Sequence, residues 1–504
     1  MSTIRKQSIY STLVIYGGFI IGLVNTYLFT RKGIFTEEEF GLYNVFIAIA
    51  LLLAALGNMG APYFIYKFFP YYKDRAGKNQ NDQLTLALLL GVAGFILIVV
   101  GGQLFQPIII RKYATNSPLL IYYFNWIFPL AGGLLLFNIL ESWSWQQHLS
   151  VKSNFLKEGV WRLYILLLIF GFMVDTSHSF ARFIQLFAFS YPLLAFLLIL
   201  LLIRKNKLPL TLTFTALTKR LKKPILNYTS FTYLGTLVFV IAQVFDSILI
   251  PSVLENALVQ LAVYSLAQNM ASMLQAPQRG IIAASMEPLS RAWKEKDKGT
   301  LNKIYQRSAI NLLLFSALLF GLFIINYENA INTLNLKPIF LTGLSVFFLL
   351  GFAKMIDLGT GVNSQLIITS PGWRFEFYSG IVLITCMLPL SYFLTKTMGI
   401  TGTALAQLIS ITIYNSCRVW YLHQKFQLQP FNFTTLRIIL VAGLLISGSY
   451  FSFKGWTGWL GLIGSSGIYV GAFAFAIWRF KLTPDLQPVL ETIQKKWKTK
   501  LFTR

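Results

Sequence analysis

Long apolar runs, repeated along the whole chain, limit its fold more than any other feature. A helix needs about 20 mostly apolar residues to cross a hydrocarbon core about 30 Å thick. On that measure the sequence holds about fourteen candidate transmembrane helices. They fall near residues 9–29, 41–64, 84–106, 118–140, 160–175, 180–203, 226–250, 257–283, 308–327, 338–358, 375–395, 400–421, 436–453 and 457–478. We therefore predict an all-α, polytopic transmembrane protein.

The charge balance supports lipid as the main solvent and gives an orientation. Only 12% of residues are charged, against about a quarter in soluble proteins. The net charge of +25 would suggest nucleic acid in a soluble chain, but basic loops facing an anionic cytoplasmic leaflet explain it without nucleic acid. With the N-terminus inside, roughly four Lys and Arg residues fall in cytoplasmic segments, Arg162 and Arg418 among them, for each one outside. Both termini are thus predicted to be cytoplasmic.

The largest interior break in the apolar pattern divides the chain. Residues 204–225 carry two basic clusters around a Thr/Leu stretch, six helices in, which is where a linker between helical bundles should fall. The tail has apolar residues at helical spacing beside lysines, which is typical of an interfacial helix, although a frayed basic tail is an equal alternative. The predicted parts are an N-terminal six-helix bundle (1–203), a basic cytoplasmic linker (204–225), a C-terminal six-helix bundle (226–425), two additional helices (426–480) and a basic amphipathic cytoplasmic tail (481–504).

Three short segments resemble a known family. The acidic entry to the second helix reads EEEFGLY at 37–43, the seventh helix contains FDSILI at 245–250, and the eighth begins AVYSLA at 262–267. GLYNVFIAIA at 41–50 also occupies the place in the first half that AVYSLAQNMA at 262–271 occupies in the second. These features resemble the bacterial polysaccharide flippases, the lipid-linked-oligosaccharide branch of the MATE-like exporter superfamily.

The resemblance implies a fold and a cargo. Two six-helix bundles would form a V around a central cavity that opens alternately to each side, with the last two helices as an extra pair. The cargo would be a polyprenyl-pyrophosphate-linked oligosaccharide, moved from the inner to the outer leaflet of the bacterial cytoplasmic membrane for cell-surface polysaccharides such as lipopolysaccharide O-antigen. Its partners would be that glycan, membrane lipids, and a glycan polymerase and glycosyltransferases.

Two other functions are alternatives. One is a cation-coupled exporter of small organic molecules with the same fold, although a cationic cavity would repel cationic drugs. The other is a membrane glycan polymerase, which usually needs sizeable extracytoplasmic loops. Here the longest predicted outside loop has about ten residues, and the sequence lacks a nucleotide-binding loop or a serine nucleophile motif. We therefore predict a transporter and not an enzyme.

Arg279 is the first candidate for substrate binding, together with Gln275 one turn before it. It follows Gln275 and Pro277 late in the predicted eighth helix, where proline frees backbone carbonyls. An ionisable side chain at membrane depth is costly, and a guanidinium can bind phosphate oxygens in pairs. The equal alternative is an arginine at the cytoplasmic mouth that extends to water.

Other ionisable residues in predicted spans are candidates for pyrophosphate or ion binding. Lys354 and Asp357 lie three residues apart, hence on one helical face. They would form a pyrophosphate-binding lysine beside an ion-coupling carboxylate. The slightly favoured alternative is an internal ion pair, or two residues near the cytoplasmic end of the helix. Asp246, in the middle of the seventh helix, would bind Na⁺ or H⁺ or pair with a base. A Na⁺ or H⁺ gradient is the only cofactor-like requirement predicted.

Polar residues without charge complete the predicted site. Asn25, Asn58, Gln268 and Asn269 would contact sugar hydroxyls, although each alone is better explained as a helix–helix contact. Trp143 and Trp145 would stack on sugar rings or, more simply, form an interfacial belt. The three histidines are scattered and lack metal-ligand spacing, so we predict no metal site.

Overall fold

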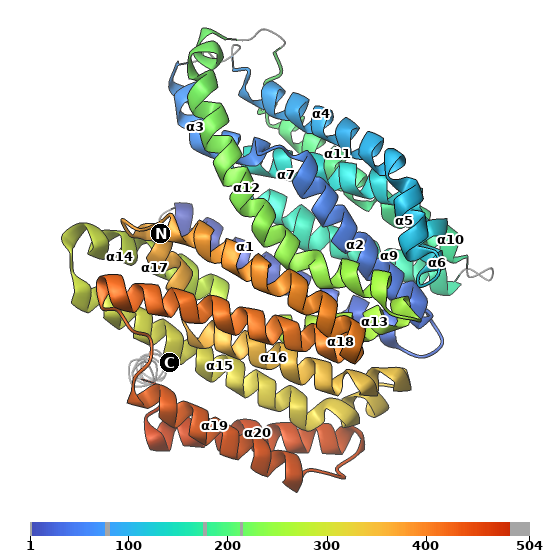
Figure 1. Cartoon of the computed structure of the whole chain (residues 1–504), viewed down its shortest axis with the longest axis vertical. Helices are drawn as coiled ribbons and strands as arrows, with labels where there is room; N and C mark the ends of the chain where they lie inside the picture. The colour runs from blue at the N-terminus through green and yellow to red at the C-terminus, as the bar shows by residue number, and fades with distance from the viewer. Residues whose placement is uncertain (1–2, 76–80, 175–178, 212–214, 484–504) are drawn as a thin grey trace, which may run out of the picture. The chain divides into compact units, whose positions relative to one another are not determined.

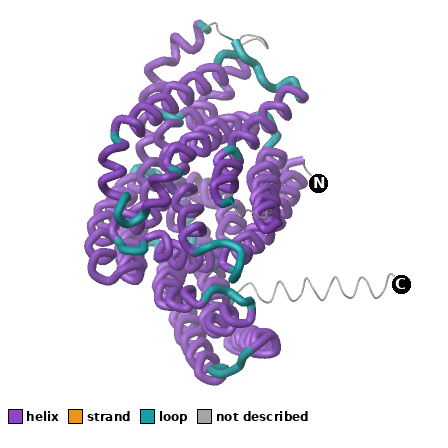
Figure 2. Tube along the Cα trace, turned by 90° about the vertical axis from the view of Figure 1, so that its right-hand side faces the viewer, coloured by secondary structure: helices purple, strands orange, loops and turns teal. Residues whose placement is uncertain are grey.

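A computed structural model describes residues 3–75, 81–174, 179–211 and 215–483. The regular elements in these ranges are helices joined by short loops (Figure 2), which confirms the all-α prediction. Ten of the described helices are long and apolar enough to cross a membrane. Most of the predicted tail, from residue 484 onward, lies outside the described residues.

The chain forms two compact units, residues 1–262 and 263–504. The helices of the first unit come in chain order, with a 3-10 turn (η1) and a π-helical turn (η2) among them. They are α1 (Thr3–Thr30), α2 (Glu37–Gly57), α3 (Ala61–Arg75), α4 (Gln83–Leu104), α5 (Gln106–Tyr113), α6 (Pro118–Tyr122), η1 (Phe124–Trp126), α7 (Ile127–Gln146), α8 (Ser150–Asn154), η2 (Phe155–Val160), α9 (Trp161–Val174), α10 (Phe180–Ala188), α11 (Ser190–Arg204) and α12 (Ala216–Val253).

The second unit begins within α13, which crosses the boundary between the units. Its helices are α13 (Ala257–Met273), α14 (Gln278–Glu295), α15 (Lys298–Thr333), the 3-10 turn η3 (Pro338–Gly343), α16 (Leu344–Gly359), α17 (Asn363–Thr369), α18 (Phe375–Phe426), α19 (Phe433–Ser452) and α20 (Gly458–Phe480). Figure 1 shows α19 and α20 beside each other, and both contact α15. Tyr469 of α20 donates a hydrogen bond to the carbonyl of Ala317 of α15 at 3.2 Å.

Several predicted spans differ from the helices that form. The span at 257–283 is broken between α13 and α14, and that at 160–175 is the short α9, preceded by the π-helical turn. The spans at 375–395 and 400–421 share one long element, α18, whose backbone is non-helical at Gly399 (φ 63°, ψ −146°). A side chain is strained at this positive φ, so glycine provides the corner between two spans. The total of about fourteen remains a prediction.

The acidic segment before α2 explains where that helix begins. The Thr36 side chain accepts from the Glu39 amide at 3.2 Å, and the Glu39 carboxylate accepts from the Thr36 amide at 2.7 Å. This reciprocal capping box satisfies two N–H groups that a helix start would leave unpaired, while three acidic residues face the positive end of the helix dipole. The predicted helix entry at 37–43 is confirmed.

Small residues let the helices of the first unit approach closely. A Cβ on Gly94 of α4 would lie 2.0 Å from the carbonyl oxygen of Gly57, and one on Gly41 would lie 1.9 Å from that of Leu258. Such contacts are how apolar helices gain packing energy when lipid removes the hydrophobic drive between them. Trp143 lies inside the core of this unit, fully buried, and its Nε1 donates to the Lys207 carbonyl at 2.8 Å. Neither the belt nor the sugar-stacking interpretation fits this residue.

The segment between α11 and α12 is fastened to the first unit by one buried carboxylate. Asp82, only 1% exposed before α4, accepts from the Thr215 amide at 2.9 Å and from the Thr215 and Thr218 hydroxyls at 3.0 and 2.8 Å. Thr215 is also the N-cap of α12. We call these three residues the Asp82 clamp. Figure 1 shows α12 running along α2 and α3, so this predicted first helix of the second bundle belongs to the first compact unit.

Candidate functional site

A hydrogen-bonded network in the second unit joins two of the residues predicted from sequence. Gln275 lies in the break between α13 and α14, and its Nε2 donates to Asp357 Oδ2 at 3.4 Å. Asp357 is partly buried near the end of α16. Lys354 lies one turn earlier, also partly buried, but no hydrogen bond or ion pair joins these two described residues. The favoured interpretation of an internal ion pair between them is therefore not seen in this structure.

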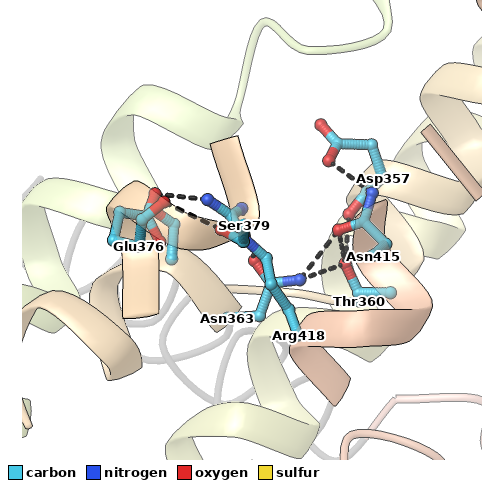
Figure 3. A network of polar contacts seen from close by, with 8 residues as sticks. Asp357, Thr360, Asn363, Glu376, Ser379, Asn415 and Arg418 are labelled. Atoms are coloured by element: carbon cyan, nitrogen blue, oxygen red, sulfur yellow. Dashed lines mark hydrogen bonds and ion pairs between the residues drawn. The ribbon is translucent and has the colours of Figure 1, made fainter. Parts of the chain in front are cut away.

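Three neutral side chains continue the network from Asp357 (Figure 3). Asn415 of α18 donates from Nδ2 to Asp357 Oδ1 at 3.0 Å. Its Oδ1 accepts from Asn363 Nδ2 at 2.8 Å and from the Thr360 hydroxyl at 3.0 Å. Asn415, Asn363 and Thr360 are all buried, so each bond is shielded from water and its partners are costly to separate.

A buried ion pair closes the other end of the network. Arg418, one turn beyond Asn415, binds the Glu376 carboxylate through Nη2 and donates from Nε to the Ser379 hydroxyl at 3.2 Å. Its guanidinium carbon lies 3.9 Å from the centre of the Tyr414 ring. Glu376, in the first turn of α18, also accepts from the Ser364 hydroxyl at 2.7 Å. We call the connected residues from Gln275 to Glu376 the polar chain; its full membership is Gln275, Asp357, Thr360, Asn363, Ser364, Glu376, Ser379, Asn415 and Arg418.

Arg279 lies apart from this chain in the same unit. It occupies the first turn of α14, is exposed, and forms no hydrogen bond or ion pair with a described residue. The same helix carries Arg291, whose Nε lies 2.8 Å from Glu295 Oε1. Arg279 thus offers a guanidinium that no described side chain occupies.

The remaining predicted residues are dispersed. Asn58 ends α2 and accepts from the Gly60 amide at 2.8 Å, a local turn contact. Gln268 is partly buried and Asn269 exposed on α13. Asp246 is buried in α12 and takes part in a polar or electrostatic interaction. Their proposed roles in binding stay predictions.

A second set of charged residues lies in the first unit. Lys157 of η2 pairs with Glu141 of α7 at 2.9 Å, and Arg162 of α9 pairs with Glu158 at 2.8 Å. The buried Glu141 Oε1 has no hydrogen-bond partner among the described residues. A π-helical turn, common at functional sites, supplies Lys157 and Glu158. We call these four residues the paired charges.

Helix α1 approaches the paired charges through two glycines. A Cβ on Gly18 would lie 2.2 Å from the Glu158 carbonyl oxygen, and one on Gly22 would lie 2.9 Å from Arg162 Nη1. Asn25, one turn further, donates to the Arg162 carbonyl at 2.9 Å, while its buried Oδ1 has no partner among the described residues. Asn25, predicted to contact substrate, therefore holds α1 against α9.

Sequence reasoning missed four charged residues, three of which the same reasoning should have found. Arg418 and Arg162 were counted among cytoplasmic charges, yet both fall inside predicted spans, at 400–421 and 160–175. Arg418 is in fact buried, with 4% of its surface exposed. Glu376 lies in the predicted span 375–395, and Glu141 directly follows the span ending at 140. Because ionisable groups inside spans are functional candidates, that rule applied evenly would have selected Arg418, Arg162 and Glu376, and would have missed Glu141 by one residue.

Comparison with solved structures identifies the fold. The lipid II flippase MurJ in an inward closed conformation superposes with a TM-score of 0.73 at 16% identity, over 94% of this chain and 99% of that one. An inward-facing multidrug resistance MATE transporter of the MOP superfamily gives 0.62 at 14% identity, over 82% and 98%. An outward-facing conformation of such a transporter gives 0.57 at 14% identity, over 84% and 96%. The fold is therefore that of multi-pass membrane transporters of this superfamily.

The family follows from the sequence itself. Residues 4–293 match the model of a family described as polysaccharide biosynthesis protein. The chain belongs to that family, whose structural neighbours are flippases and exporters rather than enzymes. No curated protein matches it in sequence.

Proposed function

We propose that the chain moves a polyprenyl-pyrophosphate-linked oligosaccharide from the inner to the outer leaflet of the bacterial cytoplasmic membrane by alternating access. The family match carries the proposal, because it links the chain to polysaccharide biosynthesis. The fold shared with a lipid II flippase supports moving a lipid-linked glycan over making one. The excess of basic residues in alternate loops supports an orientation with both termini in the cytoplasm.

The diphosphate of such a cargo needs cationic partners inside a low-dielectric membrane. Arg279 suits this role because its guanidinium is exposed and unoccupied, and a planar guanidinium binds phosphate oxygens in pairs. Lys354, partly buried and without an ion pair, is the second candidate. Amide side chains such as Asn269 would then contact the sugars.

Asp357 is the proposed ion-coupling residue, with Asp246 as the second candidate. A cation that reached Asp357 would compete with the Gln275 amide for Oδ2. Gln275 stands four residues before Arg279, in the break between α13 and α14. Losing that bond would remove a side-chain contact between Asp357 and the break that precedes Arg279, and we propose this contact as the connection between ion binding and cargo binding.

The test is a translocation assay with the full-length protein in liposomes that carry a fluorescent polyprenyl-pyrophosphate oligosaccharide. A membrane-impermeant reagent reports how fast the glycan appears in the opposite leaflet. Arg279→Ala should slow the rate by about 10- to 100-fold, the equivalent of a charge-assisted hydrogen bond. Arg291→Ala, in the same helix but already paired with Glu295, is the matched control and should keep the wild-type rate.

The outcomes separate the candidate functions. An unchanged rate for Arg279→Ala would remove that residue from the mechanism. Efflux of small organic molecules without glycan transfer would favour the MATE-type exporter. A wild-type rate that is indifferent to both Na⁺ and proton gradients would eliminate ion coupling through Asp357 and Asp246.

A further inference from the structure

One residue fixes the direction of the hydrogen bonds along the polar chain. Arg418 Nη1 donates to Asn363 Oδ1 at 3.4 Å. A guanidinium has donors only, so Asn363 must turn its carbonyl oxygen toward Arg418. The amide nitrogen of Asn363 then faces the opposite way, toward Asn415.

The same constraint passes through the next amide to Asp357 (Figure 3). Asn363 Nδ2 donates to Asn415 Oδ1 at 2.8 Å, so the oxygen of Asn415 is already committed. Asn415 can offer Asp357 only its Nδ2, which lies 3.0 Å from Oδ1. An amide turned over would place its oxygen against the carboxylate, which repels it. The direction of both amides therefore decides whether Asp357 meets a donor.

Arg418 is itself held in place, so the hydrogen bonds of Asn363 and Asn415 cannot reverse their direction. The Glu376 carboxylate, the Ser379 hydroxyl and the Tyr414 ring each contact its guanidinium. With 4% of its surface exposed, it cannot exchange these partners for water. These contacts of Arg418 lie at the opposite end of the hydrogen-bonded network from Asp357.

We propose that Arg418 is a positioning residue that acts on Asp357 through Asn363 and Asn415, by making both amides present their N–H groups toward the carboxylate. This inference rests on the proposed coupling role of Asp357. It assigns to Arg418 a function beyond pairing with Glu376. Without the guanidinium, the Asn415 amide could turn over, and Asp357 Oδ1 would then lose the hydrogen bond that Asn415 Nδ2 donates.

The first test uses thermal unfolding of the purified full-length protein and needs no transport. Tm is measured for Arg418→Gln, Asp357→Asn and the double variant. Residues that share no partner normally give additive losses. The proposal expects the double variant to lose less Tm than the two single losses combined, because glutamine offers an acceptor that lets both amides turn. Arg418→Gln combined with Asp82→Asn, in the first unit, is the control and should be additive. Additive losses in both pairs would overturn the proposal.

Two further variants keep the test decisive if Arg418→Gln does not fold. Asn363→Asp retains the acceptor for Arg418 but cannot donate to Asn415, so it cuts the chain without removing the ion pair. It should also show a non-additive Tm loss with Asp357→Asn. Arg418→Lys has donors only and should preserve the direction of the amides, so its Tm loss should add to that of Asp357→Asn, unlike the loss of Arg418→Gln. Additivity for Asn363→Asp would overturn the proposal.

The liposome assay provides the functional readout. Stimulation of translocation by the driving ion gradient should fall about tenfold or more in Arg418→Gln and recover largely in Arg418→Lys, whereas a purely structural role would affect both alike. Equal losses in the two variants would contradict positioning. If the wild-type protein moved no lipid-linked glycan, the proposed function would fail, while the Tm measurements would still decide the role of Arg418.

Discussion

The two units arrange the charged residues between their helices in different ways. In the first unit the paired charges form two separate ion pairs, Lys157 of η2 with Glu141 of α7, and Arg162 with Glu158 one helical turn away. In the second unit the polar chain runs continuously from Gln275 to Glu376 through side chains of several helices. Within it, the neutral amides of Asn415 and Asn363 connect Asp357 with the Arg418–Glu376 ion pair.

The difference teaches what each arrangement can transmit. A closed ion pair neutralises two charges locally, and its loss affects few other groups. A chain of amides couples distant groups because each amide has one donor end and one acceptor end. We therefore expect the stability losses of two substitutions to be additive in the first unit and non-additive in the second. The following predictions test that contrast.

The largest effect should come from the buried ion pair of the second unit. Arg418→Met should cost about 3–5 kcal/mol of unfolding free energy, because it leaves Glu376 buried without its counter-charge. The measurement is unfolding of the purified protein, with Glu376→Gln added to the variant as a control that should recover part of the loss. A cost below about 1 kcal/mol would contradict a buried, interdependent chain.

A smaller effect is expected in the first unit. Lys157→Met should cost about 1–3 kcal/mol, because Glu141 loses its donor while water still reaches this pair through the lysine side, which is 36% exposed. The unfolding free energies lost in Lys157→Met and in Arg162→Met should be additive, because no hydrogen bond joins these two described ion pairs. Strong non-additivity would show that the first unit also contains a connected network and would break the contrast.

The smallest effect should come from an exposed carboxylate outside both sets. Asp297, the N-cap of α15, accepts from the Thr300 hydroxyl at 2.6 Å and the Thr300 amide at 3.0 Å. These bonds lower the pKa of the Asp297 carboxyl below its ordinary value of 3.8. The ionised Asp297 carboxylate therefore contributes fully to folding stability above about pH 4, and this contribution is lost as the pH falls through the lowered pKa. The free energy of unfolding, measured from pH 7 to pH 3, should fall slightly more steeply for wild type than for Asp297→Asn. The same pH dependence in both proteins would show that the Asp297 cap does not contribute to stability.

The lengths of the apolar runs were enough to predict the fold class and some local boundaries. Apolar runs predicted the helices, and the acidic segment at 37–43 marked the entry to α2, whose Thr36–Glu39 capping box only the structure revealed. The resemblance in the same segment led to the family that residues 4–293 match. The corner at Gly399 was also implied, since the predicted spans separate on either side of it.

The site was only partly predictable, because its contacts join residues far apart in sequence. Gln275 and Asp357 were each selected, but 82 positions separate them and no local pattern indicates their hydrogen bond. Asn415 and Asn363 carry no charge, so nothing in the sequence distinguishes them from ordinary polar residues in helices. Arg418 was misplaced because a tally of basic residues treats every arginine near a helix end as a loop charge.

The Asp82 clamp has a practical consequence for dividing the protein into fragments. The basic stretch after Arg204 is the obvious place for a cut, yet Thr215 and Thr218 are bonded to Asp82 on the far side of that stretch. A second fragment that began at residue 205 would carry α12 away from the partners it packs against. A cut between Val253 and Ala257 would keep α12 with these partners, although it would assign residues 257–262 of the first unit, including the Leu258 carbonyl that packs against Gly41, to the second fragment. That cut leaves the Asp82 clamp intact and is the better place for a split reporter or an inserted tag.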